Sequence, residues 1–161
     1  MFRKAITAAA VSISLAAVAT MPAVANGEED RMKTVEASFD AVLQDLQDAV
    51  VNRGLVIDYV GHVNTMLERT AEASGVQQTP YLNARYMQFC SSALTHEAAA
   101  ADPSNLSMCP YLVFAYEARN APGKVVVGYR APDVRGDDAS KAAGVKVEAL
   151  LKEIVDEAVA Q

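Results

Sequence analysis

The N-terminal 25 residues most constrain what this chain can fold into, because they have the pattern of a segment that is removed before folding. Arg3 and Lys4 precede an apolar run from Ala5 to about Thr20, and alanines follow at positions 23 and 25. This pattern predicts a signal peptide over residues 1–25 and a periplasmic or secreted mature protein. Polar residues and a proline interrupt the run, which argues against a retained membrane anchor.

Removal of the signal peptide leaves 136 residues, enough for one ordinary domain with its own core. We expect a flexible leader over residues 26–33 and a single domain over residues 34–161. The mature chain has 12 basic and 20 acidic residues, a net charge near −8. Because this charge repels phosphate backbones and no basic cluster offsets it, nucleic-acid binding is not expected. No segment of the mature chain is apolar and long enough to form a stable membrane span.

Apolar periodicity predicts an α+β fold in which helices pack on a mostly antiparallel sheet. The predicted strands are residues 32–37, 55–63, 84–90, 111–118 and 124–130. The predicted helices follow Ser38, Asn64 and Ser91 or Ser92, and an apolar stripe from Val147 to Ala158 predicts a C-terminal amphipathic helix. The turn residues 120–123 between the last two strands predict a hairpin.

Cys90 and Cys109 are the only cysteines of the chain, and an oxidising compartment favours a disulfide between them. The bridge closes a loop of about 20 residues, worth on the order of 3 kcal/mol. It requires that the strands next to the two cysteines be antiparallel neighbours, since a parallel crossover would place the cysteines at opposite sheet ends. A soft-metal site of the copper type, built from His62, Cys90, Met108 and Cys109, stays open as the alternative, although no close ligand spacing joins any pair of them.

His62 is the candidate ligand-binding residue, together with Asp58 four positions earlier on the same predicted strand. A regular strand places both on one face with their Cα atoms about 13 Å apart, too far for a direct contact. His96 is expected on a helix surface. Neither histidine forms a catalytic set with a serine and an acid, and no glycine-rich phosphate loop or nucleophile elbow is present.

Six aromatic residues lie on the later predicted strands: Tyr86, Phe89, Tyr111, Phe114, Tyr116 and Tyr129. Aromatic residues on strands usually pack in the core or in cross-strand pairs. A pocket lined by them instead suits a small apolar ligand.

The chain resembles the domain-of-unknown-function family 302 from about Thr34 to Tyr129. The resemblance is carried by the order of elements and by four local motifs: Ser38-Phe39-Asp40, Arg53-Gly54-Leu55, His62 after Leu55–Tyr59, and the strand at Tyr111–Glu117 followed by Gly123–Tyr129. It implies a compact α+β domain, frequent pairing as a homodimer, and no settled activity. His62 matches a recurrent histidine of the family. The two cysteines replace residues of the two family loop motifs, which suggests that the loops lie close together.

We therefore expect an exported, non-enzymatic accessory or small-ligand-binding protein that is crosslinked by a Cys90–Cys109 disulfide. Its partner is an unknown small ligand or protein, and its cofactor is unknown. A metal-binding module using His62, Cys90 and Cys109 is the first alternative. An enzyme with a His62-containing site is the second.

Overall fold

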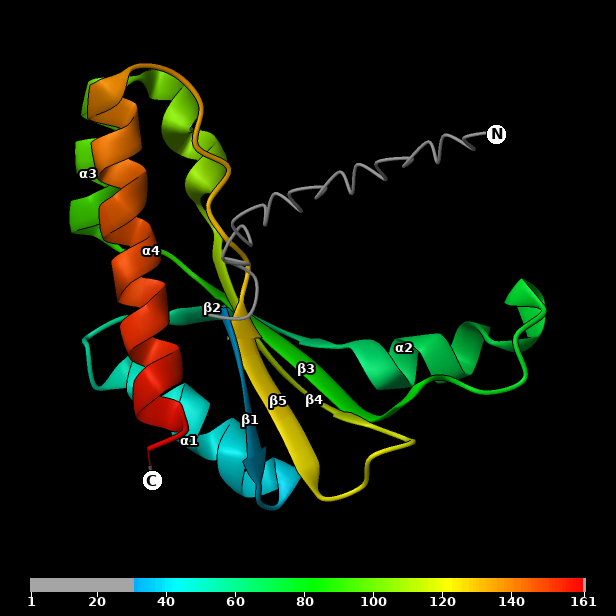
Figure 1. Cartoon of the computed structure of the whole chain (residues 1–161). Helices are drawn as coiled ribbons and strands as arrows, with labels where there is room; N and C mark the ends of the chain where they lie inside the picture. The colour runs from blue at the N-terminus through cyan, green and yellow to red at the C-terminus, as the bar shows by residue number, and fades with distance from the viewer. Residues whose placement is uncertain (1–30, 161) are drawn as a thin grey trace, which may run out of the picture.

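Five antiparallel strands form one sheet in the computed structural model, which describes residues 31–160 (Figure 1). The strands follow the spatial order β1-β5-β4-β3-β2, and every neighbouring pair is antiparallel. Their bounds are β1 (Met32–Glu36), β2 (Ile57–His62), β3 (Tyr81–Phe89), β4 (Tyr111–Ala118) and β5 (Lys124–Tyr129). The sheet confirms the predicted fold class, and the β4–β5 hairpin lies where the turn residues predicted it.

Helices cover one face of this sheet and leave most of the other face uncovered. The α-helices are α1 (Phe39–Val51), α2 (Val63–Thr70), α3 (Ser92–Ala101) and α4 (Asp138–Ala158), and the 3-10 helices are η2 (Glu72–Ser74) and η3 (Pro103–Met108). In Figure 1, α1, α3 and α4 lie to one side of the strands, and α2 extends away on the other side. The result is a two-layer α+β domain with α2 as a projecting arm.

Local side-chain hydrogen bonds begin three of the four α-helices. The hydroxyl oxygens of Ser38 and Ser91 accept from the backbone N–H of Ala41 and Leu94, and the Asp137 carboxylate accepts from the N–H of Ser140. Each bond satisfies a backbone donor that the helix itself cannot pair. Gly54 follows α1 with φ +71°, the left-handed conformation in which a glycine commonly ends a helix.

The core lies between the sheet and the helices α1 and α4. Alternate residues of the central strand β4 and of its neighbour β5 are almost fully buried: Val113 and Ala115 on β4, and Val125 and Val127 on β5. The apolar faces of α1 and α4 pack against these strand residues. They consist of Leu46, Val50, Val147, Leu151, Ile154 and Val155. Burial of each large aliphatic side chain contributes roughly 1.5–3 kcal/mol. The C-terminal apolar stripe therefore packs on the chain's own sheet.

The folded domain begins earlier than residue 34. Arg31 Nε donates to Glu148 Oε1 at 2.8 Å, and β1 starts at Met32, so residues 31–33 of the predicted leader belong to the fold. The predicted signal peptide and the rest of the predicted leader lie outside the described residues. Within the described range, none of the helices combines the length and the apolar character needed to cross a bilayer.

Two local features differ from the sequence expectations. The second helix starts at Val63, and Asn64 does not cap it, because the buried Asn64 side chain turns to β3 and donates to the carbonyl oxygen of Leu82. The segment after Asp102 also forms the helix η3, where a loop was expected. Asp102 starts this helix by accepting from the N–H of Ser104 at 2.7 Å.

Candidate functional site

An apolar surface covers the sheet face that α1 and α4 leave free. On β4, the residues that alternate with the core residues are Leu112, Phe114 and Tyr116, each half-buried. They continue across the sheet through Ala84 and Tyr86 of β3 to Tyr59 of β2, and through Gly128 to Met32 of β1; the polar residue among them is Gln88, which lies between Leu112 and Tyr59. We call this surface the open face. A solvated sheet face normally alternates polar residues with the core, so an apolar one needs a functional explanation.

Two glycines shape the open face by leaving room for aromatic rings. Gly61 pairs with Tyr86 across β2 and β3, and a Cβ at Gly61 would lie 2.0 Å from Tyr86 Cε1. Gly128 pairs with Phe114 across β5 and β4, and a Cβ there would lie 2.6 Å from Phe114 Cζ. Each ring therefore lies over the backbone of the neighbouring strand. This geometry requires glycine at both positions.

The rings on the open face enclose two adjoining hollows. The central hollow measures about 370 Å³ and is lined by Phe114, Tyr116, Tyr81 and Tyr86 among others. Phe114 and Tyr116 stack with centroids 6.3 Å apart, and Tyr81 meets Tyr116 edge to face at 5.5 Å. The second hollow, which we call the His62 groove, measures about 270 Å³ and shares Val63 and Tyr86 with the first.

The His62 groove lies between the end of β2 and the projecting helix α2. Its aromatic wall is Tyr59 and Tyr86, with centroids 5.9 Å apart, and Met66 of α2 faces them. Tyr59 and Met66 are 55% and 44% exposed, so both present apolar surface to solvent. His62 and Arg69 lie on the α2 side of the groove. The groove thus combines an aromatic platform with polar groups at one end.

The charged or imidazole residues that line the two hollows are all of the basic types. They are His62 and Arg69 in the groove and Arg85 in the central hollow. Arg85 donates to the Asn64 side-chain oxygen and to its neighbour's carbonyl, the Ala84 oxygen at 3.0 Å. The whole chain has a formal charge of −6, so these hollows are a locally basic region of an acidic protein.

Of the two predicted ligand-binding residues, only His62 reaches the candidate site. Asp58 is exposed, lines neither hollow, and falls at an irregularity of the β2–β3 pairing between Ile57 and Tyr59. This bulge interrupts the alternation of residues between the two faces of β2. The regular spacing that predicted Asp58 and His62 on one face therefore does not apply here. His96 is exposed on α3, as expected.

The candidate metal ligands do not assemble. Cys90 and Cys109 form a disulfide with their Cα atoms 5.8 Å apart, at the end of β3 and just before β4. Met108 is 4% exposed and packs in the core. His62 pairs with Arg85, which lies four residues before Phe89, the last residue of β3 and the neighbour of Cys90. Among residues 31–160, no group of three or more His, Cys, Asp or Glu side chains is placed to hold a metal ion.

The six aromatic residues of the later strands divide between the two faces of the sheet. Phe89, Tyr111 and Tyr129 are in the core, whereas Tyr86, Phe114 and Tyr116 line the open face. Sequence reasoning missed Tyr59, Arg69 and Arg85 as site residues. The signal that points to the open face is β4 itself, where both alternating sets of residues from Tyr111 to Tyr116 are apolar.

The match to known proteins agrees with this architecture. Residues 31–158 match the family described as Domain of unknown function DUF302. The chain belongs to this family. Among solved structures, the DUF302 domain is similar to that of an uncharacterized conserved DUF302 protein from Bacillus stearothermophilus, with a TM-score of 0.63 and 14% sequence identity. The similarity covers 79% of this chain and 97% of that one, and at this identity it shows the fold.

Comparison of this DUF302 domain with curated proteins found no match.

Proposed function

We propose that this DUF302 protein is exported and binds a small amphipathic molecule on its open face without catalysing a reaction. The apolar part of the ligand lies over the aromatic rings of the central hollow, and its anionic group lies at His62 and Arg69. The observation that carries the proposal is an apolar sheet face whose charged or imidazole lining residues are all of the basic types. Pockets that bind small molecules are mostly apolar with a few convergent polar groups.

Export rests on the N-terminal pattern of residues 1–25. The Cys90–Cys109 bridge is consistent with it, because disulfides persist in oxidising compartments and are rare in reducing ones. Accumulation of a chain cut after Ala25 outside the cytoplasm is the expected result of fractionating cells that express the full precursor.

The anionic dye anilinonaphthalene sulfonate tests the binding site, because its fluorescence rises when its rings leave water for an apolar surface. We expect saturable binding that weakens in Phe114→Ser and in Arg69→Gln. Val145→Ser and Lys141→Gln are the matched controls, since both side chains are exposed on α4, away from the open face. Equal binding by all four variants contradicts the proposal.

Sedimentation of the same samples separates ligand binding from self-association. An apolar face of this kind also suits a second copy of the chain. A dimer that excludes the dye, and that dissociates in Phe114→Ser, would replace the small ligand with a protein partner. The metal-binding and enzymatic alternatives gain no separate support from the positions of His62, Cys90 and Cys109.

A further inference from the structure

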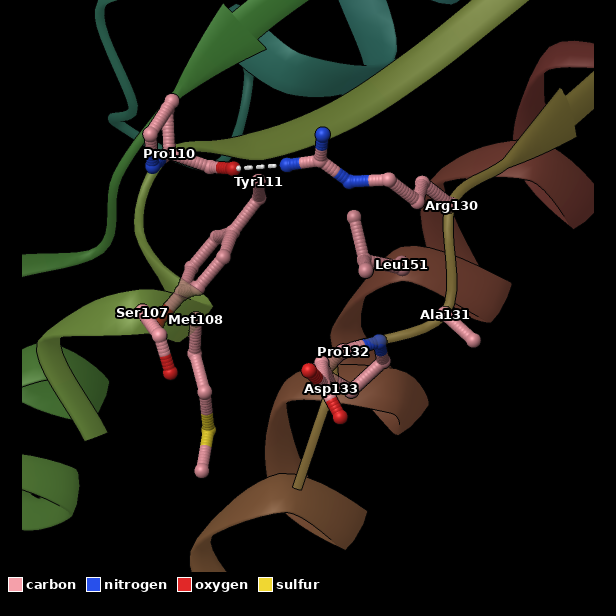
Figure 2. Close-up of a pocket in the computed structure, with 9 residues that line it drawn as sticks. All are labelled: Ser107, Met108, Pro110, Tyr111, Arg130, Ala131, Pro132, Asp133 and Leu151. Atoms are coloured by element: carbon pink, nitrogen blue, oxygen red, sulfur yellow. Dashed lines mark hydrogen bonds between the residues drawn. The ribbon is translucent and has the colours of Figure 1, made fainter. Parts of the chain in front are cut away.

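A third hollow lies on the helix-covered side of the sheet, and its lining residues are not those of the open face. It measures about 280 Å³ and opens between the η3–β4 junction, the segment after β5, and α4. Figure 2 shows its lining residues, with Arg130 on one side, Tyr111 and Met108 on another, and Asp133 and Leu151 toward α4. We call it the Arg130 pocket. It shares no residue with the two hollows of the open face.

The apolar wall of the Arg130 pocket is part of the hydrophobic core. Met108, Tyr111 and Leu151 are 4%, 2% and 1% exposed, and all three belong to the main core cluster. Their positions are set by packing on all other sides. The pocket is therefore a place where the rigid core reaches the surface, which lowers the conformational cost of binding.

A disulfide and a pair of buried hydrogen bonds hold the η3 side of the pocket. The disulfide to Cys90 fixes Cys109, which lies between the lining residues Met108 and Pro110. The buried Asn105 side chain donates to the Ala98 carbonyl oxygen at 3.0 Å and to Ser140 Oγ at 2.9 Å, joining η3 to α3 and α4. Both links keep the pocket wall in one arrangement.

Arg130 supplies a positioned positive charge. Its backbone N–H donates to the Leu112 carbonyl oxygen, and its Nη2 donates to the Pro110 carbonyl oxygen, each at 2.9 Å. Figure 2 shows the side chain reaching across the pocket toward Pro110. Within residues 31–160 the guanidinium has no carboxylate partner, and a guanidinium carries five N–H donors in a fixed fork.

The other charged lining residue, Asp133, is already paired. Its two carboxylate oxygens accept from Arg135 at 3.2 and 2.7 Å. Arg135 offsets the Asp133 charge from outside the pocket. The charge left for a ligand is therefore the positive charge of Arg130.

We infer that the Arg130 pocket is a second binding site, specific for a small monocarboxylate with an apolar body. The carboxylate accepts from the Arg130 guanidinium, and the body packs on Tyr111, Leu151 and Met108. The volume of about 280 Å³ lies at the lower limit of small-molecule pockets, roughly 300–1,000 Å³, which suits a small ligand such as benzoate. Charge-assisted hydrogen bonds from arginine are the usual recognition of such carboxylates.

Titration with 4-fluorobenzoate, followed by fluorine NMR and by backbone amide shifts of the labelled mature protein, tests this inference. We expect shifts at Ser107, Ala131 and Leu151, and a loss of affinity of about tenfold or more in Arg130→Gln. Lys124→Gln is the matched control, because it removes the same charge from the opposite end of β5, and its affinity should equal that of the wild type. Binding by 4-fluorobenzyl alcohol should be lost.

The inference is overturned by shifts confined to Tyr86 and the open face, by equal affinity for the alcohol, or by unchanged affinity in Arg130→Gln. The first of these results is read on the wild type and needs no variant. Tighter binding of 4-fluorophenylalanine than of 4-fluorobenzoate, lost in Asp133→Asn, would assign the pocket to zwitterions and also reject a monocarboxylate site. Arg69→Gln leaves this site intact, so the outcome is independent of the function proposed for the open face.

Discussion

The phenol ring of Tyr86 occupies the space directly above Gly61, its partner across the β2–β3 ladder. A side chain at residue 61 would occupy the volume that the ring now fills. The ring in turn forms the boundary between the two hollows of the open face. One backbone position on an edge strand thus sets the shape of the candidate binding surface.

Replacing Gly61 with alanine should displace Tyr86 and destabilise the fold by about 1–3 kcal/mol, as overpacking does elsewhere. Urea denaturation gives the free energy of unfolding. The same substitution made in a Tyr86→Ala background should cost less, because the conflicting ring is gone. An equal cost in both backgrounds would mean that Tyr86 is not the source of the strain.

Loss of the Cys90–Cys109 bridge should lower the free energy of unfolding by about 3 kcal/mol, because the bridge restricts a loop of about 20 residues in the unfolded chain. The double variant Cys90→Ser, Cys109→Ser and the reduced wild type should lose similar amounts in urea. Thiol titration of the denatured, unreduced mature protein should find no free thiol. Two free thiols per chain would show that the bridge does not form.

Replacing Asn105 with alanine should cost about 1–3 kcal/mol, because it removes two buried hydrogen bonds: Ser140 Oγ loses the Asn105 donor, and the Ala98 carbonyl oxygen keeps only the N–H of Asp102. The side-chain amide of Asn105 is the link between the Ala98 carbonyl oxygen and Ser140 Oγ. Thermal unfolding compared with the exposed control Gln78→Ala gives the difference. A shift no larger than that of the control would argue that the link carries little energy.

Acid should destabilise the protein through Glu117 and Asp137. The backbone N–H of Gly123, followed by the Asn83 side chain, lowers the pKa of Glu117, and the backbone N–H of Ser140 lowers the pKa of Asp137. A carboxyl whose pKa is lowered by folding stabilises the fold above its unfolded pKa, and this contribution is lost as the pH falls through the folded pKa.

The free energy of unfolding should therefore decrease below about pH 4, where carboxyls of an unfolded chain take up protons. Both groups are close to solvent, so each effect is modest. Urea midpoints at pH 7 and pH 3 measure the decrease, and it should be smaller in Glu117→Gln, Asp137→Asn than in the wild type. A steeper decrease in the double variant would reverse the assigned sign.

Features that depend on neighbours within a few residues could be predicted from the sequence. The N-caps Ser38 and Ser91, the turn at 120–123 and the apolar stripe of α4 each express a local preference that the tertiary structure left in place. The fold class followed from these elements, since helices with one apolar face need a sheet to cover. That His62 is a ligand-binding residue stays a prediction, although it lines the groove beside α2.

What the tertiary structure alone decided is which of these elements lie side by side. The antiparallel pairing of β3 with β4 brings Cys90 to Cys109. His62 pairs with Arg85 in the middle of β3, away from the cysteines, so the proposed ligand set is divided between a disulfide and a separate groove. Arg130 and Met108 are 22 positions apart, and only the packing of η3 and the segment after β5 against α4 places them around one pocket. Periodicity along a strand shows which residues share a face, but contacts between distant segments arise from packing, which no local pattern encodes.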